Sequence, residues 1–269
     1  MSNKLRILFF GDVMGQPGRN ALANALIELR PKFNPNVVIA NAENATHGFG
    51  INKTHVEEIL RLGVDVLTSG NHIWDQKDAE ETLEAYPHKL LRPGNYPSYS
   101  DNPCPGSAIT YYKYQSDQPP LAVVNIQGRV FMEPIDCPFG FLDEHIQQIR
   151  AETSLTLVDF HAQATSEKMA FAHYFDGQVS AIVGTHTHVQ TADEQIFPKG
   201  TAYITDVGLC GSQFSVIGMR PVDSLFRMRF KRPRRFEVAS ERVEARAVII
   251  DIDTRTGKSI HIERLQIPL

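Results

Sequence analysis

The chain has 269 residues, of which 42% are apolar and 22% charged, as is typical of a soluble globular protein. Its formal net charge of −4 gives no general attraction to nucleic acid or anionic membranes, and no stretch approaches the roughly 18 apolar residues that span a bilayer. The short apolar run near the N-terminus is no signal peptide and the three cysteines lack C-x-x-C spacing, so we expect a cytoplasmic protein with reduced thiols.

The first part of the chain alternates predicted strands with predicted helices. Short apolar, β-branched runs predict strands, and apolar residues at helical spacing predict helices. In chain order we expect a strand at 7–10, a helix at 19–30, a strand at 37–40, a helix at 52–62, a strand at 64–68 and a helix at 77–86. This order predicts parallel strands joined by right-handed crossovers.

The rest of the chain adds strands of both directions. We expect strands at 108–114 and 121–126, a helix at 142–150, a strand at 155–160, a helix at 166–175, strands at 179–183 and 202–205, and an antiparallel hairpin of 243–253 with 259–266. Residues 92–120 and 209–240 are expected to be loops or lids. Together these elements predict an α/β fold of two packed mixed β-sheets flanked by helices, an α/β/β/α sandwich in one domain over residues 1–269.

Five short polar clusters directly follow predicted strands. They are Gly11-Asp12, Asn41-Ala42-Glu43-Asn44, Gly70-Asn71-His72, Phe160-His161 and Gly184-Thr185-His186-Thr187-His188. Open α/β sheets place their chemistry in loops at the carboxyl ends of strands. Asp, Glu, Asn and His are ligands of divalent metals. Each cluster alone is explained by a turn, a helix cap or a buried hydrogen-bonded histidine, but five together predict one site assembled from all of them.

The order of these clusters resembles that of the calcineurin-like metallophosphoesterases. That superfamily usually begins with D-x-H, whereas Met14 stands at the third position here, and it usually has a bridging Asp where Glu43 stands here. Both departures match the bacterial YmdB-like branch, known for 2′,3′-cyclic nucleotide phosphodiesterase activity. The stretches 128–132, 161–168, 184–193 and 205–208 also resemble that branch, except that Gln163 replaces an expected acid, with an effect on the metals left open.

The resemblance implies a site with two metal ions bridged by Glu43. The first ion would be held by Asp12, Glu43, Asn44 and His188, and the second by Glu43, Asn71, His161 and His186. Iron or manganese is expected, and zinc also suits these ligands. The implied reaction is hydrolysis of a phosphodiester, above all a 2′,3′-cyclic nucleotide, by metal-activated hydroxide, with His72 donating a proton to the leaving alkoxide.

Other functions are weighed against this one. A phosphomonoesterase or phosphoprotein phosphatase would use the same site. A dinucleotide-binding dehydrogenase would use Gly11, Gly15 and Gly18, but their spacing is not G-x-G-x-x-G, and the histidines would go unused.

The basic segment 229–236 holds five basic and two aromatic residues. This composition suits RNA binding without catalysis, steering of an anionic substrate, a homo-oligomer contact or a solvated loop. The loops 92–106 and 209–236 are the candidates for a base pocket.

Overall fold

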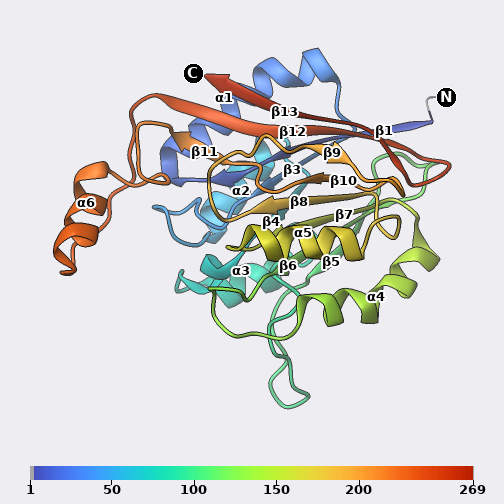
Figure 1. Cartoon of the computed structure of the whole chain (residues 1–269), viewed down its shortest axis with the longest axis horizontal. Coiled ribbons are helices and arrows are strands. Elements are labelled where there is room, and N and C mark those ends of the chain that lie inside the picture. The colour runs from blue at the N-terminus through green and yellow to red at the C-terminus, as the bar shows by residue number, and fades with distance from the viewer. Residues whose placement is uncertain (1–2, 269) are drawn as a thin grey trace.

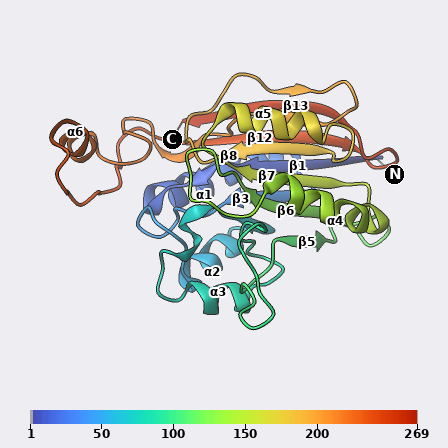
Figure 2. The same ribbon diagram turned by 60° about the horizontal axis from the view of Figure 1, so that its bottom comes forward.

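Figure 1 shows the computed structural model, which describes residues 3–268. Two β-sheets pack face to face, and helices cover the outer face of each sheet (Figures 1 and 2). The predicted α/β fold with two packed mixed sheets is confirmed.

The first sheet joins strands from both ends of the chain. Within residues 3–268 it contains β1 (Lys4–Phe10), β2 (Asp12–Val13), β3 (Val37–Asn41), β4 (Val66–Thr68), β11 (Leu209–Ser212), β12 (Val243–Asp253) and β13 (Ser259–Pro268). Their order is β2-β11-β12-β1-β3-β4, with β13 paired to β12. β1, β3 and β4 are parallel, and β12 and β13 form the predicted antiparallel hairpin.

The second sheet has a parallel centre and antiparallel edges. In the described part of the chain it consists of β5 (Ile109–Tyr112), β6 (Leu121–Gln127), β7 (Thr156–His161), β8 (Ala181–Thr185), β9 (Gln195–Ile196) and β10 (Ala202–Ile204). The order is β5-β6-β7-β8-β10-β9. The strands from β6 to β10 along this order are parallel, whereas β5 and β9 pair antiparallel with their neighbours.

Helices make up the other regular elements of residues 3–268. They are α1 (Gly15–Phe33), α2 (Lys53–Arg61), the 3-10 helix η1 (Asn71–Trp74), α3 (Ala79–Ala85), α4 (Pro138–Glu152), α5 (Thr165–Tyr174) and α6 (Pro221–Phe230). The apolar faces of α1 and α2 pack on the first sheet, and those of α4 and α5 on the second. Among residues 3–268, no helix combines the length and the apolar character that crossing a membrane requires.

The central strand β1 shows why both faces of the first sheet are apolar. Leu5, Ile7 and Phe9 point into the core between the sheets, whereas Leu8 and Phe10 point into the core under the helices. Successive side chains of a strand face opposite sides, so a strand covered on both faces must be apolar throughout. The strand therefore lies in the centre of the fold, and Asp12 follows its carboxyl end at the edge of the sheet.

Residues 209–240 contain regular structure where a loop or lid is expected. β11 joins the first sheet, and α6 stands apart from both sheets at the end of an arm (Figures 1 and 2). The apolar side chains of Val222, Leu225 and Met228 on α6 are exposed. α1 is also longer than expected, since it begins at Gly15 and continues through Pro31 to Phe33. A role as a lid stays a prediction.

Candidate metal centre

The carboxyl ends of five strands meet at one edge of the two sheets. β1, β3 and β4 run parallel in the first sheet, and β7 and β8 run parallel in the second. Parallel strands present their carboxyl ends at the same edge of a sheet. The five polar clusters follow these ends, so the fold brings together side chains that are far apart in the sequence.

Asp12, Glu43 and His188 form the first group of candidate ligands. Their ligand atoms all lie within 4.8 Å of one another, and all three side chains are buried. His188 Nε2 lies 3.7 Å from Asp12 Oδ1. The side-chain amide nitrogen of Asn44 lies 3.2 Å from His188 Nε2 and 3.0 Å from Glu43 Oε1. The four residues expected at the first metal therefore lie together.

Glu43, His161 and His186 form the second group of candidate ligands. Their ligand atoms also lie within 4.8 Å of one another. His161 Nε2 is the centre of the group, at 3.2 Å from Glu43 Oε1, 3.0 Å from His186 Nδ1 and 3.2 Å from Asn71 Oδ1. Glu43 belongs to both groups, which is the position expected of a bridging ligand.

A hydroxyl and a buried carboxylate fix the orientation of the His161 ring. Thr185 Oγ1 donates a hydrogen bond of 2.7 Å to Asp159 Oδ1, which uses its only hydrogen. The same oxygen lies 2.9 Å from His161 Nδ1 and must accept the Nδ1 hydrogen. His161 Nε2 is therefore the ring nitrogen available to a metal, as in sites where a second layer of side chains orients the ligands.

The His188 ring is oriented by a backbone carbonyl. His188 Nδ1 lies 2.9 Å from the carbonyl oxygen of Ile217. A carbonyl oxygen can only accept, so Nδ1 carries the hydrogen and donates it. Nε2 then carries the lone pair, which faces Asp12 and the side-chain amide nitrogen of Asn44. The segment 209–240 thus contributes to the site through its backbone, and not through a side chain that sequence analysis could have singled out.

The atoms at the centre of the cluster fit cations. Asp12 Oδ1 is buried and has no hydrogen-bond partner among residues 3–268. A buried carboxylate oxygen without a partner is costly. The neighbouring groups, Glu43 and the Nε2 atom of His188, are acceptors as well. Carboxylate, amide and imidazole ligands that converge in this way form a donor set suited to divalent metals.

Burial and the neighbouring charges shift the pKa values of the candidate ligands. Burial raises the pKa of Asp12 to about 7, against the opposing effect of nearby histidines. Burial also opposes ionisation of Glu43, yet His161 and other histidines hold its pKa well below its usual range. Burial disfavours a charged His161, but Glu43 and Asp12 raise its pKa to about 9. Without a cation, His161 therefore carries a second proton that a metal would displace.

The backbone of the His186-Thr187-His188 loop turns both histidines toward the cluster. In a regular extended strand His186 and His188 would face one side and Thr187 the other, because side chains alternate. Instead both adopt left-handed conformations, with φ of 96° and 65°. Such conformations are costly for residues other than glycine and concentrate at functional sites.

A buried ion pair holds this loop. Asp206 accepts hydrogen bonds from the backbone nitrogen of Thr187 at 3.0 Å and from its hydroxyl at 2.6 Å. Lys168 Nζ lies 2.9 Å from Asp206 Oδ2 and 2.7 Å from the carbonyl oxygen of Thr185, and both charged side chains are buried. Lys168 and Asp206 lie in the stretches 161–168 and 205–208 that resemble the YmdB-like branch, but neither was expected to have a role in the site.

His72 lies at the mouth of the site. Its Nδ1 atom is 2.6 Å from Asp75 Oδ2, and its backbone nitrogen donates to Glu43 Oε2 at 3.1 Å. The side chain is 30% exposed, so it is accessible to a substrate. Asp75 was not singled out from the sequence, although it follows His72 by one turn of a 3-10 helix. A role of His72 as proton donor stays a prediction.

Two cavities adjoin the cluster and share His72 and His186 in their walls. The smaller, of about 220 Å³, is also lined by Glu43, Asn44 and His188. The larger, of about 630 Å³, is completed by residues 131–134 along with Asn71 and Asp75. Of the two loops expected to form a base pocket, only 209–236 contributes to either wall within residues 3–268, through Ile217 in the smaller cavity.

The residues that depart from the family pattern have different surroundings. Met14, where a histidine is usual, is buried against Leu209 and Met219 and is part of the apolar core. Gln163, where an acid is expected, lines the smaller cavity. Its effect on the metals stays a prediction.

The basic segment lies on the arm, where it consists of the last two residues of α6 and the chain that follows (Figure 2). The guanidinium groups of Arg232 and Arg234 lie over the ring of Phe226, at 5.2 and 5.1 Å from its centroid. Contacts of this segment with RNA or with a second copy of the chain stay predictions.

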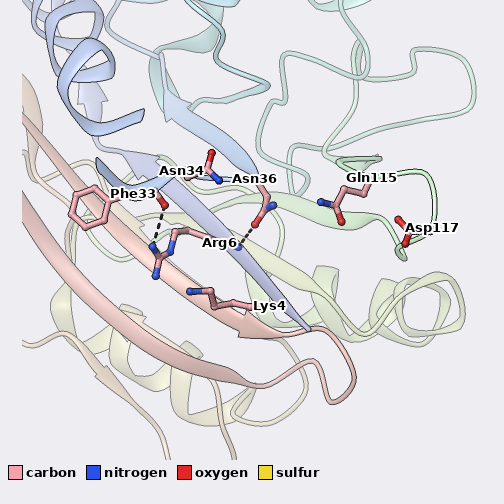
Figure 3. Close-up of a pocket in the computed structure, with 7 residues that line it drawn as sticks. All are labelled: Lys4, Arg6, Phe33, Asn34, Asn36, Gln115 and Asp117. Carbon is pink, nitrogen blue, oxygen red and sulfur yellow. Dashed lines mark hydrogen bonds between the residues drawn. The ribbon is translucent and has the colours of Figure 1, made fainter. Parts of the chain in front are cut away.

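A separate cavity of about 490 Å³ lies at the amino end of β1. Figure 3 shows Arg6 donating to the carbonyl oxygen of Phe33. Arg6 also makes two hydrogen bonds to Asp251, and Lys4 donates to the same carboxylate. These cations are already paired, so this cavity lacks the free charge that an anion site requires.

Comparison with known proteins gives a family and a fold. A sequence model of the family described as "YmdB-like protein" matches residues 8–265. The chain is 44% identical over 263 residues to the 2′,3′-cyclic-nucleotide 2′-phosphodiesterase of Bacillus subtilis, which covers 98% of this chain and 97% of that protein.

Two solved structures have folds similar to that of this chain. A crystal structure described as a novel phosphatase of Mycoplasma pneumoniae superposes with a TM-score of 0.90 at 38% identity, covering 100% of this chain and 95% of that one. A calcineurin-like phosphoesterase of Bacillus subtilis gives a TM-score of 0.56 at 11% identity, covering 98% of this chain and 90% of that one. The second likeness shows a shared fold.

Proposed function

The chain belongs to the YmdB-like protein family, and from this premise we propose that it is a metal-dependent phosphodiesterase that hydrolyses 2′,3′-cyclic nucleotides. The predicted membership of the YmdB-like family and the predicted calcineurin-like fold are both confirmed. The named activity of the Bacillus subtilis relative supports the reaction. The observation that carries the proposal is the place of Glu43 in both ligand groups, since one shared carboxylate can bridge two adjacent metals.

The calcineurin-like fold implies divalent metal ions. The cluster contains two groups of candidate ligands, one for each of two ions. The first set is Asp12, Glu43, Asn44 and His188, and the second is Glu43, Asn71, His161 and His186. Asn44 would bind through its amide oxygen, which exchanges places with the nitrogen when the amide group flips. Two bound metals supply Lewis-acid stabilisation of the phosphoryl oxygens and lower the pKa of water.

We propose iron or manganese as the resident metals. Imidazole suits iron and zinc, whereas carboxylate and amide oxygens suit manganese, so zinc is the competing choice. The neutral amides of Asn44 and Asn71 limit the negative charge around the metals, which preserves their Lewis acidity.

His72 is the group we propose as general acid. Asp75 fixes the ring through Nδ1, so Nε2 is the nitrogen left to give a proton. In the reaction, the oxygen of water forms a bond to phosphorus and that water releases a proton to solvent, while the bond from phosphorus to one ribose oxygen breaks and that oxygen takes the proton of His72. The histidine then regains a proton from solvent. A sugar alkoxide leaves poorly without a proton, so a diester with such a leaving group gains most from this residue.

The substrate class is tested by comparing kcat/KM on 2′,3′-cyclic AMP, 3′,5′-cyclic AMP and a phosphoserine peptide, at fixed metal and ionic strength. We expect the 2′,3′-cyclic nucleotide to be hydrolysed with the highest kcat/KM. A preference for the phosphopeptide would favour the phosphatase alternative on the same site. No hydrolysis of any ester by the metal-loaded protein would contradict both.

A further inference from the structure

Phe131 is an unusual surface residue. Its side chain is 88% exposed, and its backbone is left-handed, with φ of 62°. An aromatic residue gains nothing from exposure to water, and the left-handed region costs a residue with a Cβ about 1–2 kcal/mol. Single exposed apolar side chains are common on proteins, but few are combined with such a backbone. The surroundings of Phe131 therefore indicate whether it has a role in ligand binding.

The amino-terminal side of the Phe131 loop is fastened to α5. The carboxylate of Glu167, a largely buried side chain, accepts hydrogen bonds of 3.1 Å from the backbone nitrogens of Arg129 and Val130. Gly128 permits this approach, since a Cβ there would lie 2.5 Å from Glu167 Oε2. The carboxylate thus holds the backbone of the two residues that directly precede Phe131.

The carboxyl-terminal side of the loop is fastened by Asn95. Its side-chain nitrogen donates to the carbonyl oxygens of Gln127 at 2.7 Å and Asp136 at 2.9 Å. The backbone nitrogen of Asp136 donates back to the Asn95 carbonyl oxygen at 3.0 Å. Both ends of the loop are therefore anchored, which restricts the positions open to the Phe131 backbone and favours a preorganised contact.

The position of Phe131 relative to the metal centre points to its ligand. It lines the cavity of about 630 Å³ together with Met132 and Pro134, and His72 and His186 line the same cavity. That volume is in the range of cavities that bind small molecules, whereas the neighbouring cavity of about 220 Å³ suits a phosphate beside the candidate ligands. His72 lies in both walls, where the bond between phosphate and ribose would break. The nucleoside would then extend into the larger cavity.

Resting on the proposed function, we propose that Phe131 is the platform on which the nucleobase of a 2′,3′-cyclic nucleotide stacks. Every base offers a π-face, so stacking on this ring accepts all four bases, with the larger purines favoured modestly. Phe131 determines affinity for the nucleoside and takes no part in breaking the bond. Its removal should therefore be visible in KM and not in kcat.

The test compares 2′,3′-cyclic AMP with ribose 2′,3′-cyclic phosphate, which lacks the base. Phe131→Ala should raise KM for the nucleotide by about 5- to 150-fold, the range for losing one base stacked on an aromatic ring. It should leave kcat within about 2-fold, and change neither constant for the base-free ester. Phe131→Trp should restore KM.

The matched control is Tyr99→Ala, which removes an exposed aromatic side chain from the loop 92–106. It should leave KM unchanged. An equal loss for Phe131→Ala on both esters, or a large effect of Tyr99→Ala alone, would overturn the proposal. If the wild-type protein hydrolyses neither cyclic ester, the proposed function itself fails. If it hydrolyses both and Phe131→Ala has no effect, only the stacking proposal fails.

Discussion

Lys168 Nζ donates a hydrogen bond of 2.9 Å to Asp206 Oδ2, and both side chains lie in the interior beneath the His186-Thr187-His188 loop. Lys168 opposes the effect of burial and keeps the pKa of Asp206 below its usual range. The carboxylate in turn holds Thr187, so a buried charge pair fixes the loop that carries two candidate ligands.

Removing Lys168 should therefore weaken both the fold and the metal centre. Lys168→Met leaves Asp206 buried without its cation, which should lower the free energy of unfolding by about 3–5 kcal/mol. Chemical denaturation of the metal-free protein measures this. The double variant with Asp206→Asn should recover part of the loss, because the unpaired charge is gone. A loss below about 1 kcal/mol, as expected for the exposed control Lys199→Met, would contradict the role of the pair.

The two metal positions should be separable by mutation. His188→Ala should deplete the first position and Asn71→Ala the second, because each residue belongs to one ligand set only. Elemental analysis of manganese-loaded protein should show about two equivalents in the wild type and fewer in each variant. His261→Ala, which removes an exposed histidine from β13, should retain both metals. Full metal content in both ligand variants would show that the ligand sets are misassigned.

His72→Ala should retain both metals but lose turnover of 2′,3′-cyclic AMP by about 10²–10⁴-fold, the contribution of general acid catalysis. The loss should be smaller for a p-nitrophenyl diester, whose leaving group needs no proton. Asp75→Asn should give a weaker form of the same pattern, because it disturbs the ring through Nδ1. Equal losses of kcat on both esters would mean that His72 positions the phosphate and is not the acid.

The pair of Asp251 with Arg6 makes stability depend on pH. Burial opposes ionisation of Asp251, but Arg6 and Lys4 hold its pKa below the usual value. A depressed pKa stabilises the folded state above the unfolded pKa of about 3.9, and this contribution is lost as pH falls through the folded pKa. Asp251→Asn should cost about 1.5–3 kcal/mol at pH 6 and progressively less below pH 4.

Urea unfolding of the metal-free protein at pH 6, 4 and 3 measures this dependence. The exposed control Asp101→Asn should follow the wild type at every pH. A constant difference between Asp251→Asn and the wild type across this range would rule out a contribution from titration of Asp251.

The strands that carry the site were predictable because they are apolar on both faces. Phe9 and Phe10 are both buried, one in each core, so the run is unbroken and Asp12 marks its end. The same argument located Glu43 and His161. Strands as short as β2 and β9 have no such signal, since their two residues are defined only by their pairing partners.

The remaining parts of the site depend on contacts that spacing does not encode. Asp206 follows Lys168 by 38 residues, and neither position reveals the other. Phe131 required the loop conformation to distinguish it from other exposed aromatics. α6 was not predicted from the sequence. Its apolar residues Val222, Leu225 and Met228 have helical spacing, but they face solvent and do not pack against either core.

The central claim is a pair of metals bridged by Glu43, and anomalous scattering from crystals of manganese-loaded protein tests it most directly. We expect two peaks roughly 3.5–4 Å apart, both in contact with the Glu43 carboxylate. One peak should also contact Asp12 and His188, and the other His161 and His186. A single peak, or two peaks of which one does not contact Glu43, would contradict the account.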